Sequence, residues 1–145
     1  MIDFNKKDFD KMPNPTISAR LTIYIDGDFD SKEIENALGF KAKFVKQKSQ
    51  QKLSIVTNKI PSGYIVFMAK EISTRNENEV VLPMIDYLFE RKTQIEQIQK
   101  KYNARMVLLV ESLLKSFKNS NLKLEPEYIS KLSQLNIGLE HNIEF

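Results

Sequence analysis

The chain contains no cysteine, which excludes disulfides, thiolate nucleophiles and cysteine-ligated zinc or iron–sulfur sites together. Its four glycines are isolated and form no glycine-rich phosphate loop. No apolar run reaches the length of a membrane span, and the first eight residues lack the apolar core of a signal peptide. We therefore expect a soluble cytoplasmic protein that carries no cofactor.

Histidine is almost as scarce, since His141 is the only one. A conventional histidine-based triad would have to use it as the base. It lies in phase with the apolar residues Leu139 and Ile143, where we expect a partly buried structural side chain. Nothing selects a catalytic pair among the nineteen acidic residues, so no catalytic residue is assigned.

The residues that are present suffice for one ordinary domain. The chain has 145 residues, of which 41% are hydrophobic and 28% charged, as is typical of soluble globular proteins. The net charge of +3 is unevenly spread, because residues 36–69 hold six lysines and no acidic residue. This segment carries +6 and the remainder therefore sums to −3. The lysine-rich segment is the one electrostatic feature above background.

The region from 81 to 112 organises the fold prediction. Apolar residues at three-and-four spacing predict one long helix from about Leu82 to Tyr102, with Pro83 in its first turn. Residues 106–110 form a continuous apolar run, which is typical of a central strand buried on both faces. A helix with one apolar stripe needs a sheet beneath it, and the chain supplies strands on both sides.

Strands and short helices are predicted on either side of this region. Residues 17–25 alternate between apolar and polar side chains, which predicts a strand with one buried face. Asp30 and Glu33 have the spacing of a capping box before a helix that Gly39 ends. A helix is predicted from Glu125 to Leu135, and further strands at 42–47, 53–57, 64–69 and 139–145.

The resulting order of elements is β-α-β-β-β-α-β-α-β, in one α+β domain over residues 16–145. We expect a mostly antiparallel sheet with helices packed on one face. Residues 1–15 end in Pro13-Asn14-Pro15 and are expected to form a flexible N-terminal arm.

Asp26, Asp28 and Asp30 have the D-x-D-x-D spacing of a calcium loop. The EF-hand pattern also needs glycine at its sixth position and glutamate at its twelfth, which are here Ser31 and Ala37. The favoured interpretation is a strand-to-helix turn with Asp30 as the N-cap. No metal site is therefore predicted.

The lysine-rich segment supplies the candidate binding residues. On alternating strands Lys41 and Lys43 share one face, as do Lys46 and Lys48, with Phe44 between the pairs. Such a ribbon suits an acidic protein surface or a phosphate backbone, but it lacks arginine and holds few stacking side chains. Lysines are also the usual guard of an exposed edge strand. The predicted partner-binding residues are Lys41, Lys43, Phe44, Lys46, Lys48 and Lys52.

Three pieces of the sequence resemble an uncharacterised bacterial family, the domain of unknown function numbered 4279. They are residues 19–23 with 33–40, the strand that begins at Tyr64 after a Ser-Gly pair, and the ending 129–145. The family tends to have tryptophan where Tyr64 stands. The resemblance covers residues 17–145 and implies an α+β domain. Members of such families often lie among toxin–immunity genes, which suggests an immunity or antitoxin-like role by analogy.

The expected function is non-catalytic binding of another macromolecule, in the first place a protein with an acidic surface. Binding of nucleic acid through the same ribbon is the alternative, and an uncharacterised enzyme with a carboxylate site is a third interpretation. Homodimerisation through an exposed strand edge also stays open.

Overall fold

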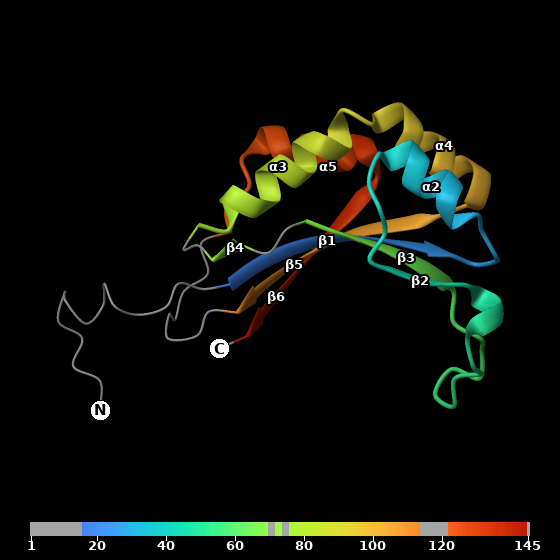
Figure 1. The fold of residues 1–145 in the computed structure, drawn as a ribbon. Helices are drawn as coiled ribbons and strands as arrows, with labels where there is room; N and C mark the ends of the chain where they lie inside the picture. Colours follow the sequence, from blue (N-terminus) through green and yellow to red (C-terminus); the bar gives the residue numbers. More distant parts are fainter. Residues whose placement is uncertain (1–15, 70–71, 74–75, 114–121, 145) are drawn as a thin grey trace, which may run out of the picture.

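The fold is a mixed sheet that helices cover on one face (Figure 1). The structure is a computed structural model that describes residues 16–69, 72–73, 76–113 and 122–144, and the predicted N-terminal arm lies outside them. The strands are β1 (Thr16–Ile25), β2 (Phe44–Lys46), β3 (Gly63–Met68), β4 (Ile72–Ser73), β5 (Arg105–Leu113) and β6 (Ile137–Glu144). The helices are α2 (Ser31–Leu38), the 3-10 turn η1 (Lys48–Gln50), α3 (Asn78–Phe89), α4 (Lys92–Tyr102) and α5 (Pro126–Leu135). The predicted α+β class is confirmed.

β1 is the central strand of the sheet, whose order is β2-β3-β1-β5-β6, and β4 also pairs with β1. β1 is antiparallel to β3, β4 and β5, and β2 is antiparallel to β3. β6 is parallel to β5, because α5 carries the chain back along the sheet between them. The prediction of a mostly antiparallel sheet is therefore confirmed, with one parallel pair at an edge.

The alternation along β1 explains why the helices lie on one side. Ile17, Ala19, Leu21 and Ile23 are completely buried, and they share one face because side chains alternate along a strand. Figure 1 shows α2, α3, α4 and α5 above that face. The helices close the core with a set of buried aliphatic side chains: Ile34, Leu38, Val81, Ile85, Leu88, Ile95, Leu132 and Leu135.

The single long helix predicted over 82–102 is wrong, because α3 and α4 are separate helices. The break falls just before Lys92, the one charged residue in the predicted apolar stripe, and leaves this lysine only half-buried. The first helix also begins at Asn78, so Pro83 lies inside α3 and not in its first turn. None of the described helices is long and apolar enough to cross a membrane.

Arg91 terminates α3 at this break. Its Nη1 donates to the backbone oxygen of Tyr87 at 3.0 Å, and its guanidinium lies 3.5 Å from the centre of the Tyr87 ring. A cation at the C-terminal end of a helix satisfies carbonyl groups that lack an intrahelical donor. The contact therefore stabilises two shorter helices in place of one long one.

The helix predicted after Asp30 is confirmed as α2. Asp30 Oδ1 accepts the backbone N–H groups of Lys32 at 3.0 Å and Glu33 at 3.3 Å, and Gly39 ends the helix with a left-handed φ of 76°. The other half of the predicted capping box is wrong. The Glu33 carboxylate instead accepts Lys101 Nζ at 2.6 and 2.8 Å, which ties α2 to α4.

The strand predicted at 53–57 is also wrong, because this stretch is a turn. The N–H of Ser54 donates to the oxygen of Lys59 at 2.9 Å, and the N–H of Asn58 donates to the oxygen of Ser54 at 2.8 Å. Asn58 has a left-handed φ of 54°, which asparagine tolerates better than most residues. These local bonds replace a strand ladder, so only the central part of the strand predicted at 42–47 forms, as β2.

Candidate binding surface

The sheet face opposite the helices carries a row of aromatic and cationic side chains. Lys46 lies opposite Tyr64 and Tyr64 lies opposite Tyr24. Tyr24 in turn lies opposite Arg105 on the other side of β1. Residues that are directly opposite on neighbouring strands share a face. Four strands therefore contribute one continuous line of side chains, the tyrosine row, which consists of Lys46, Tyr64, Tyr24 and Arg105.

Two contacts define the surroundings of the tyrosine row. The Arg105 guanidinium lies 4.4 Å from the centre of the Tyr24 ring, in a cation–π arrangement that orients an otherwise exposed side chain. Phe44, which is 51% exposed, lies opposite Val66 in the next line of residues on the same face. Three aromatic side chains and two cations thus gather at one end of the uncovered face.

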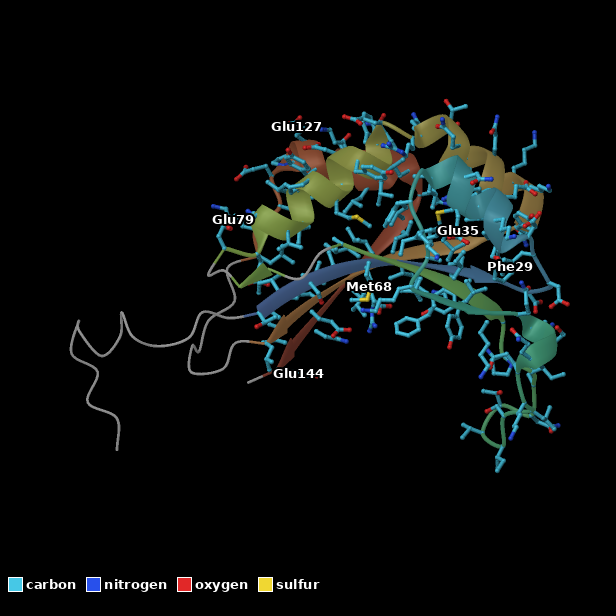
Figure 2. All side chains as sticks on the ribbon, viewed as in Figure 1. Phe29, Glu35, Met68, Glu79, Glu127 and Glu144 are labelled. Atoms are coloured by element: carbon cyan, nitrogen blue, oxygen red, sulfur yellow. The ribbon has the colours of Figure 1, made fainter. Side chains whose placement is uncertain are left out.

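The other end of this face is acidic. The uncovered face of β5 and β6 carries three glutamates, Glu111, Glu140 and Glu144. The Glu111 carboxylate binds the Arg20 guanidinium of β1, and Glu111 and Glu144 line a pocket of about 260 Å³. Figure 2 shows Glu144 near the C-terminal end of β6 and Phe29 at the opposite end of the sheet. The uncovered face is therefore split by charge along its length.

The structure separates the six predicted partner-binding residues. Phe44 and Lys46 lie in β2 and belong to the uncovered face. Lys48 lies in η1, where its Nζ donates to Asp26 Oδ1 at 2.5 Å. The other three are exposed and lie outside the strands: Lys41, Lys43 and Lys52. The two-stranded ribbon predicted to carry them does not form, and their role in binding stays a prediction.

The sequence alone does not predict that Tyr24, Tyr64 and Arg105 belong to this surface. The alternation at 17–25 places Tyr24 on the polar side of its strand, which is the only signal available for it. The residues that lie opposite Tyr24 depend on strand order and register, which one sequence does not reveal. The structure also supplies stacking side chains that the lysine-rich segment lacks.

Glu77, Ser112 and His141 form a polar cluster on the helix-covered side of the sheet. Ser112 Oγ donates to Glu77 Oε2 at 2.5 Å. His141 Nε2 lies 2.6 Å from the same carboxylate oxygen and 2.9 Å from Ser112 Oγ. Glu77 and Ser112 are each only 1% exposed. The cluster therefore supplies hydrogen bonds to a carboxylate that folding removes from water.

This cluster does not have the arrangement of a catalytic triad. The imidazole of a triad uses one nitrogen for the nucleophile and the other for the carboxylate, whereas Nε2 of His141 faces both groups here. The hydroxyl proton of Ser112 is directed at Glu77, and the hydroxyl is buried. The partly buried structural position predicted for His141 matches this geometry.

The acidic turn before α2 is engaged in ordinary contacts. Asp28 Oδ1 accepts the N–H of Ser49 at 3.1 Å, while Asp26 binds Lys48 and Asp30 caps α2. Within the described residues, no group of three or more histidine, cysteine or acidic side chains is placed to hold a metal ion. The predicted N-cap interpretation is the one that the contacts match.

Together these features define a class: a single α+β domain with one uncovered, charge-split sheet face. Within that class the chain belongs to the family described as Domain of unknown function (DUF4279), whose model matches residues 15–145. The resemblance inferred from the sequence is thereby confirmed over nearly the whole chain. Neither a curated protein nor a solved structure matches it.

Proposed function

We propose that this domain is a cytoplasmic, non-catalytic protein that binds an acidic surface of another protein. The observation that carries the proposal is the tyrosine row beside the exposed ring of Phe44. Tyrosine and arginine are among the residue types that contribute most of the binding energy at protein interfaces. The absence of cysteine agrees with a reducing compartment. The contacts of His141 with Ser112 and Glu77 do not have the geometry of a triad.

The charge pattern favours a protein over a nucleic acid as the partner. A phosphate backbone that follows the uncovered face away from the tyrosine row meets Glu140 and Glu144, and like charges repel it. A protein can present acidic groups to Lys46 and Arg105 and basic groups to the other end of the face. Such complementarity sets orientation and specificity.

The proposal includes a way in which the partner is bound. Arg105 already lies over Tyr24 in the free protein, so less side-chain freedom is lost when a carboxylate binds it. Lys41, Lys43 and Lys52 lie outside the row and are exposed. They raise the rate of encounter with an acidic partner, an effect that salt screens over about 10 Å at 0.1 M. By analogy with toxin–immunity genes, an immunity-type protein would occlude the partner's site in this way.

The first test is a pull-down from the source cells with a charge-matched control. The row variant Lys46→Glu/Arg105→Glu and the control Lys100→Glu/Lys123→Glu change the net charge equally, and the control lysines are exposed elsewhere. We expect a protein partner that survives nuclease treatment, is lost with the row variant and is kept by the control. Equal loss with both variants would show that only net charge matters and would exclude the tyrosine row.

Association kinetics with the captured partner test the flanking lysines. The variant Lys41→Glu/Lys43→Glu is expected to slow association mainly at low salt, because rim charges act on encounter more than on the lifetime of the complex. An association rate that does not change at low salt would remove these two residues from the surface.

Binding of single-stranded nucleic acid is the second candidate, and the three aromatic rings at one end of the face favour it. Stacking of a base on an aromatic side chain contributes about 1–3 kcal/mol. This candidate predicts recovery of nuclease-sensitive material, and an affinity for unrelated oligonucleotides that falls steeply with salt. A flat salt response excludes it.

A further inference from the structure

The loop between η1 and β3 ends in an apolar tip. Ile55 is 100% exposed and Val56 is 94% exposed, and Figure 1 shows the loop projecting away from the helices. Of the ten large hydrophobic side chains that are exposed among the described residues, six belong to residues 44–60. Isolated exposed apolar residues are normal, but a concentration of them marks a contact surface.

Backbone hydrogen bonds hold this tip in shape. The bonds between Ser54, Asn58 and Lys59 close the turn, and the N–H of Thr57 donates to Ser54 Oγ at 3.4 Å. The closed turn presents Ile55 and Val56 together at its end. Lys52 and Lys59 flank them and are also exposed. The tip is thus an apolar contact point with positive charge behind it.

An apolar pocket lies at the other end of β3 from the tip. It has a volume of about 500 Å³ and lies between α3 and the end of β3, where Figure 2 labels Met68 and Glu79. β2 pairs only with residues 64–66 of β3, which leaves room for a pocket beyond its end. The apolar lining includes Phe40, Met68, Val80, Pro83 and Met84, and the charged residue among its described lining is Glu79.

We propose that a second copy of this chain inserts its Ile55–Val56 tip into this pocket and receives a tip in return. The volume and apolar lining of the pocket suit two aliphatic side chains, and the lysines beside the tip carry the charge opposite to that of Glu79. The tip precedes the start of β3 at Gly63, and the pocket lies beside Met68 and Ala69 at the other end of this strand. In the proposed dimer a two-fold axis exchanges the two patches, which is the condition for a closed, isologous dimer.

A second copy is favoured as the occupant because one interface then covers both apolar features. Each insertion alone is small, but the two-fold arrangement makes two insertions at once. The contact uses residues outside the tyrosine row, so its failure would leave the proposed function unaffected. The dimer is a further property of the chain.

Light scattering across protein concentration is the direct test. The wild-type mass is expected to rise from 16.9 kDa towards twice that value. Ile55→Lys, Val56→Lys and Pro83→Glu are each expected to raise the dimer dissociation constant by at least about tenfold, since each places a charge in a desolvated contact. Pro83 is exposed, and its replacement removes no helical hydrogen bond. The control Ile129→Lys alters an exposed isoleucine of α5 and is expected to leave the mass curve unchanged.

Mixing the variants distinguishes mutual insertion from other dimers. Ile55→Lys keeps an intact pocket and Pro83→Glu keeps an intact tip, so an equimolar mixture regains one native contact per pair and is expected to associate more strongly than either variant alone. Three results would overturn the proposal. They are a wild-type protein that is monomeric at every concentration, mixed variants that do not regain association, and a dimer that Leu139→Lys on the β6 edge abolishes while the tip and pocket variants leave it intact.

Discussion

The two faces of the sheet are built from the same strands but differ in what their side chains contact. Along β1, Leu21 and Ile23 on the covered side are completely buried, whereas Tyr24 on the other side is only half-buried. On the covered side the apolar side chains pack against the helices. On the uncovered side the neighbours across the sheet decide what each residue contacts, as in the tyrosine row.

This difference separates the residues that stabilise the fold from those that are proposed to bind a partner. On the covered side, the stabilisation depends mainly on the apolar area that each side chain buries. On the uncovered side, pairs such as Tyr24 and Arg105 determine which rings and charges lie next to one another. Substitutions on the two sides should therefore differ in both size and kind.

Truncation of the two neighbouring residues of β1 is the strongest test of this difference. Leu21→Ala removes a completely buried side chain and is expected to cost about 3 kcal/mol of unfolding free energy, as core leucines do. Thr22→Ala on the uncovered side should cost at most about 1 kcal/mol. Thermal and urea unfolding would measure both. Equal losses would contradict the distinction between the faces.

The polar cluster on the covered side is expected to behave like part of the core. His141→Leu removes the imidazole 2.6 Å from Glu77 Oε2 and should cost about 1–3 kcal/mol, because the carboxylate stays buried with one hydrogen-bond partner fewer. Urea unfolding measures the loss.

A double-mutant cycle with Glu77→Gln is the control for this prediction. Groups in one hydrogen-bonded network give a coupling energy of about 0.5–3 kcal/mol. Additive effects of the two substitutions would show that the contact between His141 and Glu77 contributes nothing.

The covered side is also the part that sequence alone predicts. The alternation at 17–25 and the spacing of apolar residues in the helices report burial directly, because burial depends on each residue's own side chain. The break between α3 and α4 was not predicted, since the contact of Arg91 with Tyr87 depends on local geometry. The tyrosine row was not predicted either, because it needs the register of four strands. Lysine content pointed to β2 but not to Tyr24, Tyr64 or Arg105.

The ion pair on the uncovered face is expected to contribute little to stability. Arg20 and Glu111 have side chains that are 32% and 40% exposed, so solvent screens their attraction. A double-mutant cycle of Arg20→Ala and Glu111→Ala should give a coupling energy below about 1 kcal/mol, which falls further at high salt. A larger coupling energy that does not change with salt would show that this ion pair behaves like the buried polar cluster of Glu77, Ser112 and His141.

The smallest effect concerns the contact between α3 and α5, where polar groups meet at the outer boundary of the core. Tyr128 donates its hydroxyl to Asp86 Oδ2 at 3.2 Å, and Lys131 Nζ donates to Asp86 Oδ1 at 2.7 Å. Desolvation and then the hydrogen bond to Asp86 raise the pKa of Tyr128 above its ordinary value of 10.0. The hydrogen bond to Asp86 is the main cause that raises the pKa of Lys131 above 10.5.

Both folded-state pKa values lie above those of the unfolded chain, so the contribution of these groups to stability is complete below pH 10 and is lost as the pH rises through the folded-state values. Asp86→Asn removes the carboxylate and should move the Tyr128 pKa part of the way back towards 10.0, because the desolvation remains. Titration of tyrosinate absorbance would measure the shift, with Tyr128→Phe identifying the Tyr128 component. If that component titrates at the same pH in wild type and Asp86→Asn, burial alone sets the pKa and this helix contact acts as core packing on the covered side.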